Sequence, residues 1–313
     1  MGVSLSGRRA EIDGRDRTNR DHLCGKPSGL DRSRLSPCND RAAGTTFAPG
    51  GTRLKITVAC GQFAPVPGGI QQNTERMLSL ARQAAGMSAG ILVLPELCLC
   101  GYPPADAARG WAVPAAGREI ELLAQCAREN RIALCFGFAE AAGDHLLYNS
   151  MGFLDRAGTL RAVYRKVHLW VTEKGWATPG PGFQQVTDGD LRLGMWICYD
   201  TRFPATSRTL ARAGATLGLV GSAWFGPPEE WELALRARAL DNGMFVAGAS
   251  VLGSFGAAPF RGASLMADPH GRVLAQAREG VEGVICAEYD DRAVESFRSR
   301  LPLLSDLRPG AYA

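Results

Sequence analysis

The sequence predicts an α/β fold in which helices are layered on a mixed β-sheet. Between residues 54 and 250, short apolar runs of strand length alternate with amphipathic segments of helix length. Pairs of strand-like segments joined by short turns interrupt this alternation, and such hairpins do not occur in a purely parallel sheet. A chain of 313 residues, 46% of them hydrophobic, can also bury a large core.

The elements of the first half follow from local periodicity and turn residues. Strands are expected within 54–64, 90–97 and 132–140, with a hairpin formed by 145–155 and 159–169 about the turn at 156–158. Helices are expected over 74–85 and 118–130. Asn73 is a residue type that caps helices and stands just before the first of them.

The second half continues the same alternation. Strands are expected within 191–200, 215–223 and 244–250, and helices are expected to begin at Pro204 and to span 228–242. Residues 262–290 predict hairpin strands with Gly271 in a turn. No linker composition occurs after Leu54, so residues 53–313 are predicted to form one domain.

Residues 1–52 predict a disordered leader, because they are rich in Arg, Asp, Gly and Ser and show no periodicity. Alternatives are a targeting or docking arm, or a start codon placed too early. Residues 1–53 hold ten basic and six acidic residues, which accounts for the whole net charge of +4. The other 260 residues carry 25 of each sign. No nucleic-acid partner is therefore expected.

Composition also bears on compartment and cofactors. No run of eighteen uncharged apolar residues occurs, and the N-terminus lacks the apolar middle of a secretory signal, so we expect no membrane association. Nine cysteines, an odd number without a Cys-x-x-Cys pair, favour a reducing compartment and a cytoplasmic protein. The four histidines show no ligand spacing, so we expect no metal and no other cofactor.

Three polar residues stand directly after apolar strands: Glu96 after ILVLP, Lys166 after RAVYR and Cys198 after LGMWI. Because strand ends in layered α/β proteins bring distant segments together, we expect all three in one cleft. Taken singly, each has an ordinary alternative. Glu96 would be a solvated turn residue, Lys166 a surface cation and Cys198 a small core residue.

The three residue types suit nucleophilic catalysis. A thiol with a pKa near 8.5 is only a few per cent thiolate at neutral pH, so a catalytic cysteine needs a base and a nearby cation. Glu96 can supply the base and Lys166 the cation. Cys98 and Cys100 are expected to be small core residues.

The segments VLPELCLCGYP, YRKVHLW and WICYDTRFP, in this order and at similar spacing, resemble the three motifs of the nitrilase superfamily of carbon-nitrogen hydrolases. The resemblance runs from about Leu54 to DLRPGAY near the end. It implies a four-layer α-β-β-α sandwich with mixed sheets, paired into a homodimer or higher homo-oligomer through the layers around the nucleophile. It also implies a small-molecule amide substrate.

The resemblance further implies roles for individual residues. Cys198 would be the nucleophile, Glu96 the general base, and Lys166 would stabilise the tetrahedral intermediate with the backbone N–H of Tyr199. Glu173 matches a second glutamate that positions substrate or lysine, its alternative being an exposed loop acid. Two further candidates for substrate contact are Tyr102 and Trp224.

The pair Tyr199-Asp200 favours an amidase or carbamoylase over a nitrilase, because nitrile-hydrolysing members commonly carry Trp-Glu after the nucleophile. The segment CYDTRFP is similar to omega-amidase-like members, with departures at Thr201 and Ala205. An N-carbamoyl amidohydrolase and a nitrilase remain alternatives within the superfamily. A binding protein without turnover is the alternative from another class, although such a protein is expected to lack a catalytic residue.

Arg202 stands four residues after Cys198. In similar omega-amidases and carbamoylases an Arg at this place binds the substrate carboxylate, which a guanidinium can hold with two parallel hydrogen bonds. The substrate is therefore expected to carry a carboxylate. The alternative for Arg202 is a solvated cation paired with Asp200 or another nearby acid.

Overall fold

The computed structural model describes residues 53–143 and 145–311. These residues form two six-stranded mixed sheets and a two-stranded ribbon. The predicted leader, residues 1–52, lies outside the described residues.

The first sheet has the strand order β14-β1-β2-β3-β4-β5. Its strands are β1 (Lys55–Gln62), β2 (Ile91–Val93), β3 (Ala133–Ala142), β4 (Leu146–Leu154), β5 (Leu160–Arg165) and β14 (Gly283–Asp290). The second sheet has the order β13-β12-β9-β8-β7-β6. Its strands are β6 (Gln185–Asp188), β7 (Leu191–Ile197), β8 (Leu217–Ser222), β9 (Phe245–Ser250), β12 (Leu265–Ala267) and β13 (Val273–Gln276). The ribbon consists of β10 (Leu252–Phe255) and β11 (Ala258–Arg261).

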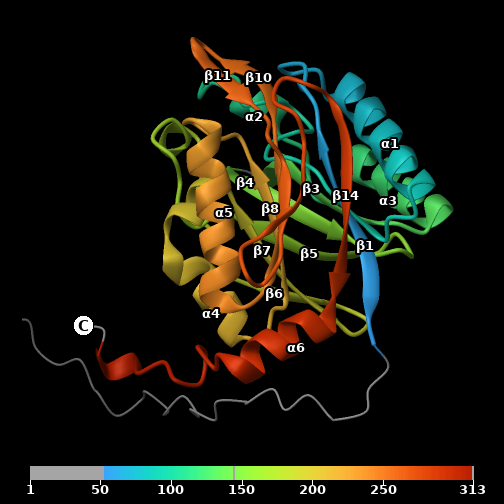
Figure 1. The fold of residues 1–313 in the computed structure, drawn as a ribbon. Helices are drawn as coiled ribbons and strands as arrows, with labels where there is room; N and C mark the ends of the chain where they lie inside the picture. The colour runs from blue at the N-terminus through green and yellow to red at the C-terminus, as the bar shows by residue number, and fades with distance from the viewer. Residues whose placement is uncertain (1–52, 144, 312–313) are drawn as a thin grey trace, which may run out of the picture. The chain divides into compact units, whose positions relative to one another are not determined.

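The residues that the structure describes also form helices. They are α1 (Ile70–Gly86), α2 (Ala108–Trp111), α3 (Arg118–Asn130), α4 (Pro204–Arg212), α5 (Pro228–Asn242) and α6 (Asp291–Arg300), with 3₁₀ helices at Glu173–Gly175, Cys198–Arg202 and Pro309–Ala311. Figure 1 shows α1 and α3 beside the first sheet and α4 and α5 on the opposite side, next to the second sheet. The four-layer α-β-β-α sandwich implied by the resemblance is therefore confirmed.

Strand alternation explains how the first sheet serves two cores. Side chains on one face enter the core shared with the second sheet, among them Val58, Cys60, Ile91, Val93 and Cys135. Their neighbours on the other face pack with α1 and α3, among them Ala59, Leu92, Leu94, Leu134 and Phe136. Because strand side chains point alternately to opposite faces, a continuous apolar run is needed where both faces are buried.

The two sheets share one sequence of pairings. From β14 to β5, and again from β6 to β13, neighbouring strands pair antiparallel, parallel, parallel, antiparallel and antiparallel. The middle strands of the two parallel sets are β2 and β8. Loops at the carboxyl ends of parallel strands lie at one edge of a sheet. The segments after β2, β7 and β8 are therefore available to build a common site.

Several expected elements match the structure. Helices α3 and α5 have the predicted bounds 118–130 and 228–242, and α4 begins at Pro204 as predicted. The hairpin of β4 and β5 turns at the predicted place. The short elements α2, β6, β10 and β11, and the helix α6, were not among the expected elements.

The expectation that Asn73 caps a helix over 74–85 is wrong. Helix α1 begins at Ile70, one turn earlier, and Asn73 lies inside it. The Asn73 side chain accepts a hydrogen bond from the N–H of Val66 at 2.7 Å and donates to the carbonyls of Val66 and Leu99 at 2.8 and 3.1 Å. The amide thus fastens the loop before the helix to the segment that follows β2.

The expectation of hairpin strands within 262–290 is correct in part. Strands β12 and β13 pair antiparallel, and Gly271 lies in their turn with a φ of +71°, a left-handed conformation that favours glycine. Strand β14, however, leaves this sheet and pairs antiparallel with β1 along its whole length. Local periodicity carries no information about which sheet such a strand joins.

Candidate active site

The structure brings the side chains of Glu96, Lys166 and Cys198 together in the seam between the sheets. Lys166 Nζ lies 2.7 Å from Glu96 Oε1, and both side chains are fully buried. The N–H of Ala223, just after β8, donates to Glu96 Oε2 at 2.6 Å. The Cys198 thiol donates to the carbonyl of the same Ala223 at 3.5 Å. Ala223 thus links the carboxylate of Glu96 to the thiol of Cys198.

Two glycines allow the segment carrying Glu96 to lie this deep. A Cβ atom at Gly137 in β3 would lie 2.4 Å from the Leu97 nitrogen and 2.7 Å from Glu96 Cα. A Cβ atom at Gly221 in β8 would lie 2.9 Å from the Glu96 nitrogen. Neither sheet could approach this segment if those positions carried a side chain.

Cys198 occupies a strained turn between strand and helix. Strand β7 ends at Ile197, and Cys198 begins a 3₁₀ helix with a φ of +41°. A non-glycine residue in this region costs free energy, and such strain concentrates at functional sites. The turn directs the thiol out of the strand, yet Cys198 remains buried, with a relative exposure of 5%.

Glu173 is the second carboxylate beside Lys166. Its Oε1 lies 2.7 Å from Lys166 Nζ and accepts a hydrogen bond from the Tyr102 hydroxyl at 2.8 Å. Its Oε2 accepts from the N–H of Trp170 at 2.9 Å. The side chain is fully buried, so the alternative of an exposed loop acid is wrong. Tyr102, a candidate for substrate contact, is thus in direct contact with the buried charged group.

Asn149 is a member of this network that the sequence reasoning missed. From β4, its Nδ2 donates to Glu96 Oε1 at 2.7 Å and to Glu173 Oε1 at 3.2 Å. The available signal was an amide in the middle of the apolar strand HLLYNSMGFLD. A buried amide requires partners, so a polar residue at that point predicts a buried polar network.

Burial and neighbouring charges set the proton affinities of the site. Burial raises the pKa of Glu96 to about 7, against the opposing effect of the Lys166 ammonium. Burial, followed by the charge of Glu96, raises the pKa of the Cys198 thiol well above its ordinary value. Burial alone would lower the pKa of Lys166, but the carboxylates of Glu173 and Glu96 raise it. In the resting site Lys166 is therefore an ammonium and Cys198 a neutral thiol, while Glu96 has a pKa of about 7 and gains or loses its proton near neutral pH.

Asp200 joins the cysteine turn to the lysine segment and was also missed. Its Oδ2 accepts hydrogen bonds from the Tyr164 hydroxyl at 2.7 Å and the Ile197 N–H at 3.1 Å. Its Oδ1 accepts from the His168 N–H at 2.9 Å and lies 2.8 Å from His168 Nδ1. The side chain is fully buried. Arg202 therefore does not pair with Asp200, but the alternative of a solvated cation paired with another nearby acid matches its ion pair with Glu230.

Arg202 and Trp224 lie together at the edge of the site. The Arg202 guanidinium carbon lies 4.4 Å from the centre of a Trp224 ring, and its Nη2 forms an ion pair with Glu230 in the first turn of α5. The Arg202 side chain is 39% exposed, whereas Trp224 is 5% exposed. The cation is thus reachable from solvent and held by an aromatic face and an acid.

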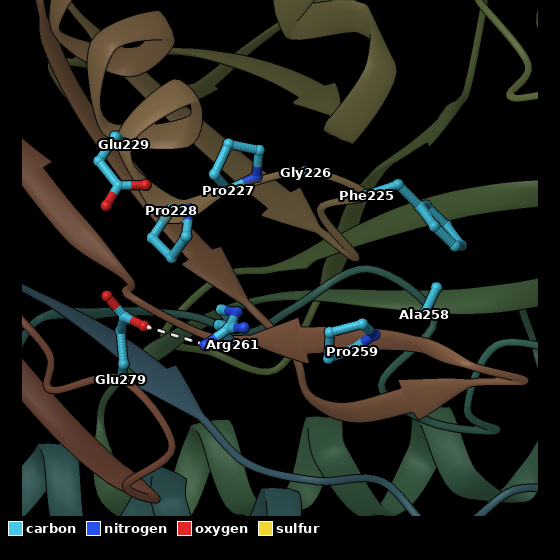
Figure 2. A pocket seen from close by; sticks show the side chains of 9 residues that line it. All are labelled: Phe225, Gly226, Pro227, Pro228, Glu229, Ala258, Pro259, Arg261 and Glu279. Atoms are coloured by element: carbon cyan, nitrogen blue, oxygen red, sulfur yellow. Dashed lines mark ion pairs between the residues drawn. The ribbon is translucent and has the colours of Figure 1, made fainter.

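Aromatic side chains and a pocket adjoin these residues. Phe225 packs against Trp170 and Tyr102, with ring centroids 5.7 and 5.4 Å apart. It also lines a pocket of about 510 Å³. Figure 2 shows residues 225–229 on one side of this pocket and β11 with Arg261 on the other. Phe225 follows Ala223, the partner of the thiol, by two residues, so their Cα atoms lie within about 7 Å of each other.

The other thiols of the described residues lack this setting. Cys98 and Cys100 are buried, and burial raises the pKa of Cys100 to about 12 and that of Cys98 further. Cys98 contacts Met77 and the carbonyl of Gly137, with neither a carboxylate nor an ammonium among its hydrogen-bond partners in the described residues.

Within residues 53–143 and 145–311, the helices are all too short or too polar to cross a membrane.

Comparison with known proteins gives consistent matches. The family model described as carbon-nitrogen hydrolase matches residues 57–299. The deaminated glutathione amidase of Homo sapiens is 33% identical over 262 residues, covering 77% of this chain and 79% of that protein. The 2-oxoglutaramate amidase of Bacillus subtilis is 32% identical over 266 residues, covering 83% of this chain and 100% of that protein.

A solved structure of an amidase mutant from Nesterenkonia sp. AN1 has the same fold, with a TM-score of 0.73 and 27% sequence identity. The match covers 82% of this chain and 95% of that chain. That structure shows covalent addition of the acetamide moiety of fluoroacetamide at the active-site cysteine of that protein.

Proposed function

The chain belongs to the carbon-nitrogen hydrolase family, and from this premise we propose that it cleaves a small amide through a thioester formed on Cys198. Amide hydrolysis is the activity that the family and its amidase relatives support. The observation that carries the assignment of Cys198 is its position beside a buried Glu96–Lys166 pair, joined to it through Ala223.

The first step is proton transfer and attack. The carboxylate of Glu96 takes the thiol proton of Cys198, and the thiolate adds to the amide carbonyl carbon. A base with a pKa of about 7 is well matched to this task at neutral pH. The raised pKa of the thiol explains why a base is required, since the thiolate is scarce in the resting site.

Stabilisation of the oxyanion falls to Lys166 and the N–H of Tyr199. An ammonium has three donor hydrogens, and two of those on Lys166 point to Glu96 and Glu173. We assign the third to the oxyanion of the tetrahedral intermediate. Glu173 then serves to hold Lys166 in place, together with Tyr102, which donates to the same carboxylate oxygen.

The second half of the reaction returns the site to its starting state. Glu96, now a carboxylic acid, gives its proton to the leaving nitrogen as the C–N bond breaks. The regenerated Glu96 carboxylate then takes a proton from water, which attacks the thioester carbonyl. Collapse of this second intermediate breaks the C–S bond, and the sulfur recovers its proton. The products are a carboxylic acid and ammonia or an amine.

Trapping of the acyl-enzyme tests this route. Hydroxylamine added during turnover should divert the thioester to a hydroxamate, because it competes with water for the same acyl group. The hydroxamate can be followed against acid formation from the same amide, with a sample lacking enzyme as the control. Acid formed at an unchanged rate without any hydroxamate would contradict a thioester.

Nitriles with the same carbon skeleton as the amide substrate should be poor substrates. Nitrile turnover equal to that of the best amide would place the protein with nitrilases.

We further propose that the preferred substrate carries a carboxylate bound by Arg202. Exposure of the guanidinium beside Trp224, next to the pocket of Figure 2, supports this assignment. An N-carbamoyl amino acid also carries a carboxylate, so the proposal includes the carbamoylase alternative.

Substitution of Arg202 by lysine tests the carboxylate. Arg202→Lys keeps the charge and loses the planar fork, so KM for acidic amides should rise about tenfold, while neutral amides of the same length change little. Steady-state kinetics on a matched pair of amides measure the difference. Equal losses of activity on both substrates would give Arg202 a structural role. A wild-type preference for the neutral amide would contradict the proposal that the substrate carries a carboxylate.

Two coarser properties complete the proposal. The cysteines that the structure describes are free thiols, which supports a reducing, cytoplasmic location. Leu233 and Leu240 lie two turns apart on α5 and are 67% and 46% exposed, which supports pairing of two copies through the α4–α5 layer.

A further inference from the structure

Three polar groups gather around Gly226, on the wall of the pocket next to the site. A Cβ atom at this glycine would lie 3.1 Å from Trp224 Nε1, 3.3 Å from Glu230 Oε2 and 3.5 Å from Arg202 Nη2. Gly226 itself lines the pocket shown in Figure 2. An indole N–H, an acid and a guanidinium therefore lie around a single position that lacks a side chain.

One of these groups lacks a partner. Trp224 Nε1 is buried and forms no hydrogen bond with any of the described residues. An indole N–H can only donate, and buried donors in proteins are normally paired. An acceptor supplied from the pocket would satisfy it. Beside a guanidinium, the acceptor with the best charge match is a carboxylate oxygen.

Glu230 already supplies a carboxylate to Arg202. It lies in the first turn of α5, where acids are favoured by the helix dipole, and its Oε2 pairs with Arg202 Nη2. Both side chains are substantially exposed, at 46% for Glu230 and 39% for Arg202. Exposed ion pairs of this kind are weak and can exchange partners.

We propose that Glu230 determines specificity by competing with the carboxylate of an acidic substrate for Arg202. In the free enzyme, Glu230 neutralises the guanidinium. An acidic amide has to displace the Glu230 carboxylate or bind beside it against charge repulsion, whereas a neutral amide does neither. Glu230 therefore lowers the preference for acidic amides that Arg202 alone would give. This inference rests on the proposed function.

The test compares Glu230→Gln with the wild type on a matched pair of amides, one with a terminal carboxylate and one neutral and of the same length. The substitution keeps the size of the side chain and removes the charge that occupies Arg202. We expect kcat/KM for the acidic amide to rise about tenfold, mainly through KM, and that for the neutral amide to stay within about twofold.

Glu229→Gln is the matched control, because it removes the same charge one residue earlier on the same helix. Glu229 lines the pocket, and within the described residues it forms no ion pair with Arg202. It should change the ratio of acidic to neutral turnover by less than about twofold. The gain from Glu230→Gln should also disappear in an Arg202→Met background, because the competition requires the guanidinium.

Three results would overturn the inference. These are equal gains from Glu229→Gln and Glu230→Gln, a gain that persists without the guanidinium, or a loss on the acidic amide, which would mean that Glu230 orients Arg202. In all three, unchanged turnover of the neutral amide leaves the proposed function intact. A wild-type protein that hydrolyses neither amide would remove the proposed function itself.

Discussion

Replacing Cys198 by alanine should abolish amide hydrolysis and leave the protein folded. The change removes the sulfur atom that forms the thioester, so no acyl-enzyme can arise. The alanine side chain keeps the Cβ atom of Cys198, a residue that is 5% exposed, so the fold loses only one buried atom. Ammonia release should fall to the background rate. Circular dichroism and a melting temperature close to that of the wild type would show that the fold is retained.

Cys98→Ala is the control for this substitution. Cys98 is also a buried thiol, and it follows Glu96 by two residues, but it packs against Met77. Its loss should reduce the free energy of unfolding by about 1 kcal/mol, as for other small cavities, and leave turnover within a few-fold. Retention of a tenth of the activity in Cys198→Ala would exclude this cysteine as the nucleophile.

Glu96→Gln should reduce kcat/KM by about 10³-fold or more, because the amide cannot take the thiol proton. The geometry adds a second cost. Oε1 accepts hydrogen bonds from Lys166 and Asn149, and Oε2 accepts one from the N–H of Ala223. Whichever position receives the NH₂ group, that group will face a donor. The melting temperature should therefore fall as well.

The pH dependence separates the chemical effect from the structural one. Glu96 must be deprotonated to act as the base, and its pKa is raised to about 7. In the wild type, kcat/KM should therefore fall as the pH drops through about 7 and level off above it. This acidic limb of the pH profile of kcat/KM should be missing from the residual activity of Glu96→Gln. An unchanged acidic limb in the variant would assign the ionisation to another group.

Asp155→Asn is the matched control for loss of a buried carboxylate. Asp155 holds the β4–β5 turn by accepting hydrogen bonds from the N–H groups of Ala157 and Thr159. Its substitution should lower the melting temperature but keep both kcat/KM and the acidic limb. A comparable loss of activity would mean that the effect of Glu96→Gln reflects general destabilisation.

The sequence could predict those parts of the fold that local pattern determines. Helices α3 and α5 match in their bounds because amphipathic periodicity and flanking residues define them. The start of α1 was misplaced because Asn73 is used in tertiary contacts rather than as a cap. The partner of β14 depends on a crossing between sheets, which no local signal specifies.

The same distinction holds for the site. Glu96, Lys166 and Cys198 stand at strand ends within motifs, so sequence reasoning could select them as candidates. Asn149 and Asp200 act through contacts between segments 24 to 53 residues apart, which no local pattern specifies, although Asp200 stands within the motif of Cys198. Glu230 was equally invisible, because only the folded chain places it beside Arg202.

The bonds that cross between the sheets also determine how the sandwich assembles. Glu96, which follows β2 of the first sheet, accepts from Ala223, which follows β8 of the second, and Asp200, which follows β7, accepts from Tyr164 in β5. Hydrophobic attraction is non-directional, so two apolar faces alone could settle in more than one alignment. Sliding one sheet by a single pleat repeat, about 7 Å, would break these bonds and leave buried carboxylates short of donors, at a cost of several kcal/mol. Glu96 and Asp200 thus also fix the alignment in which the two sheets pack against each other.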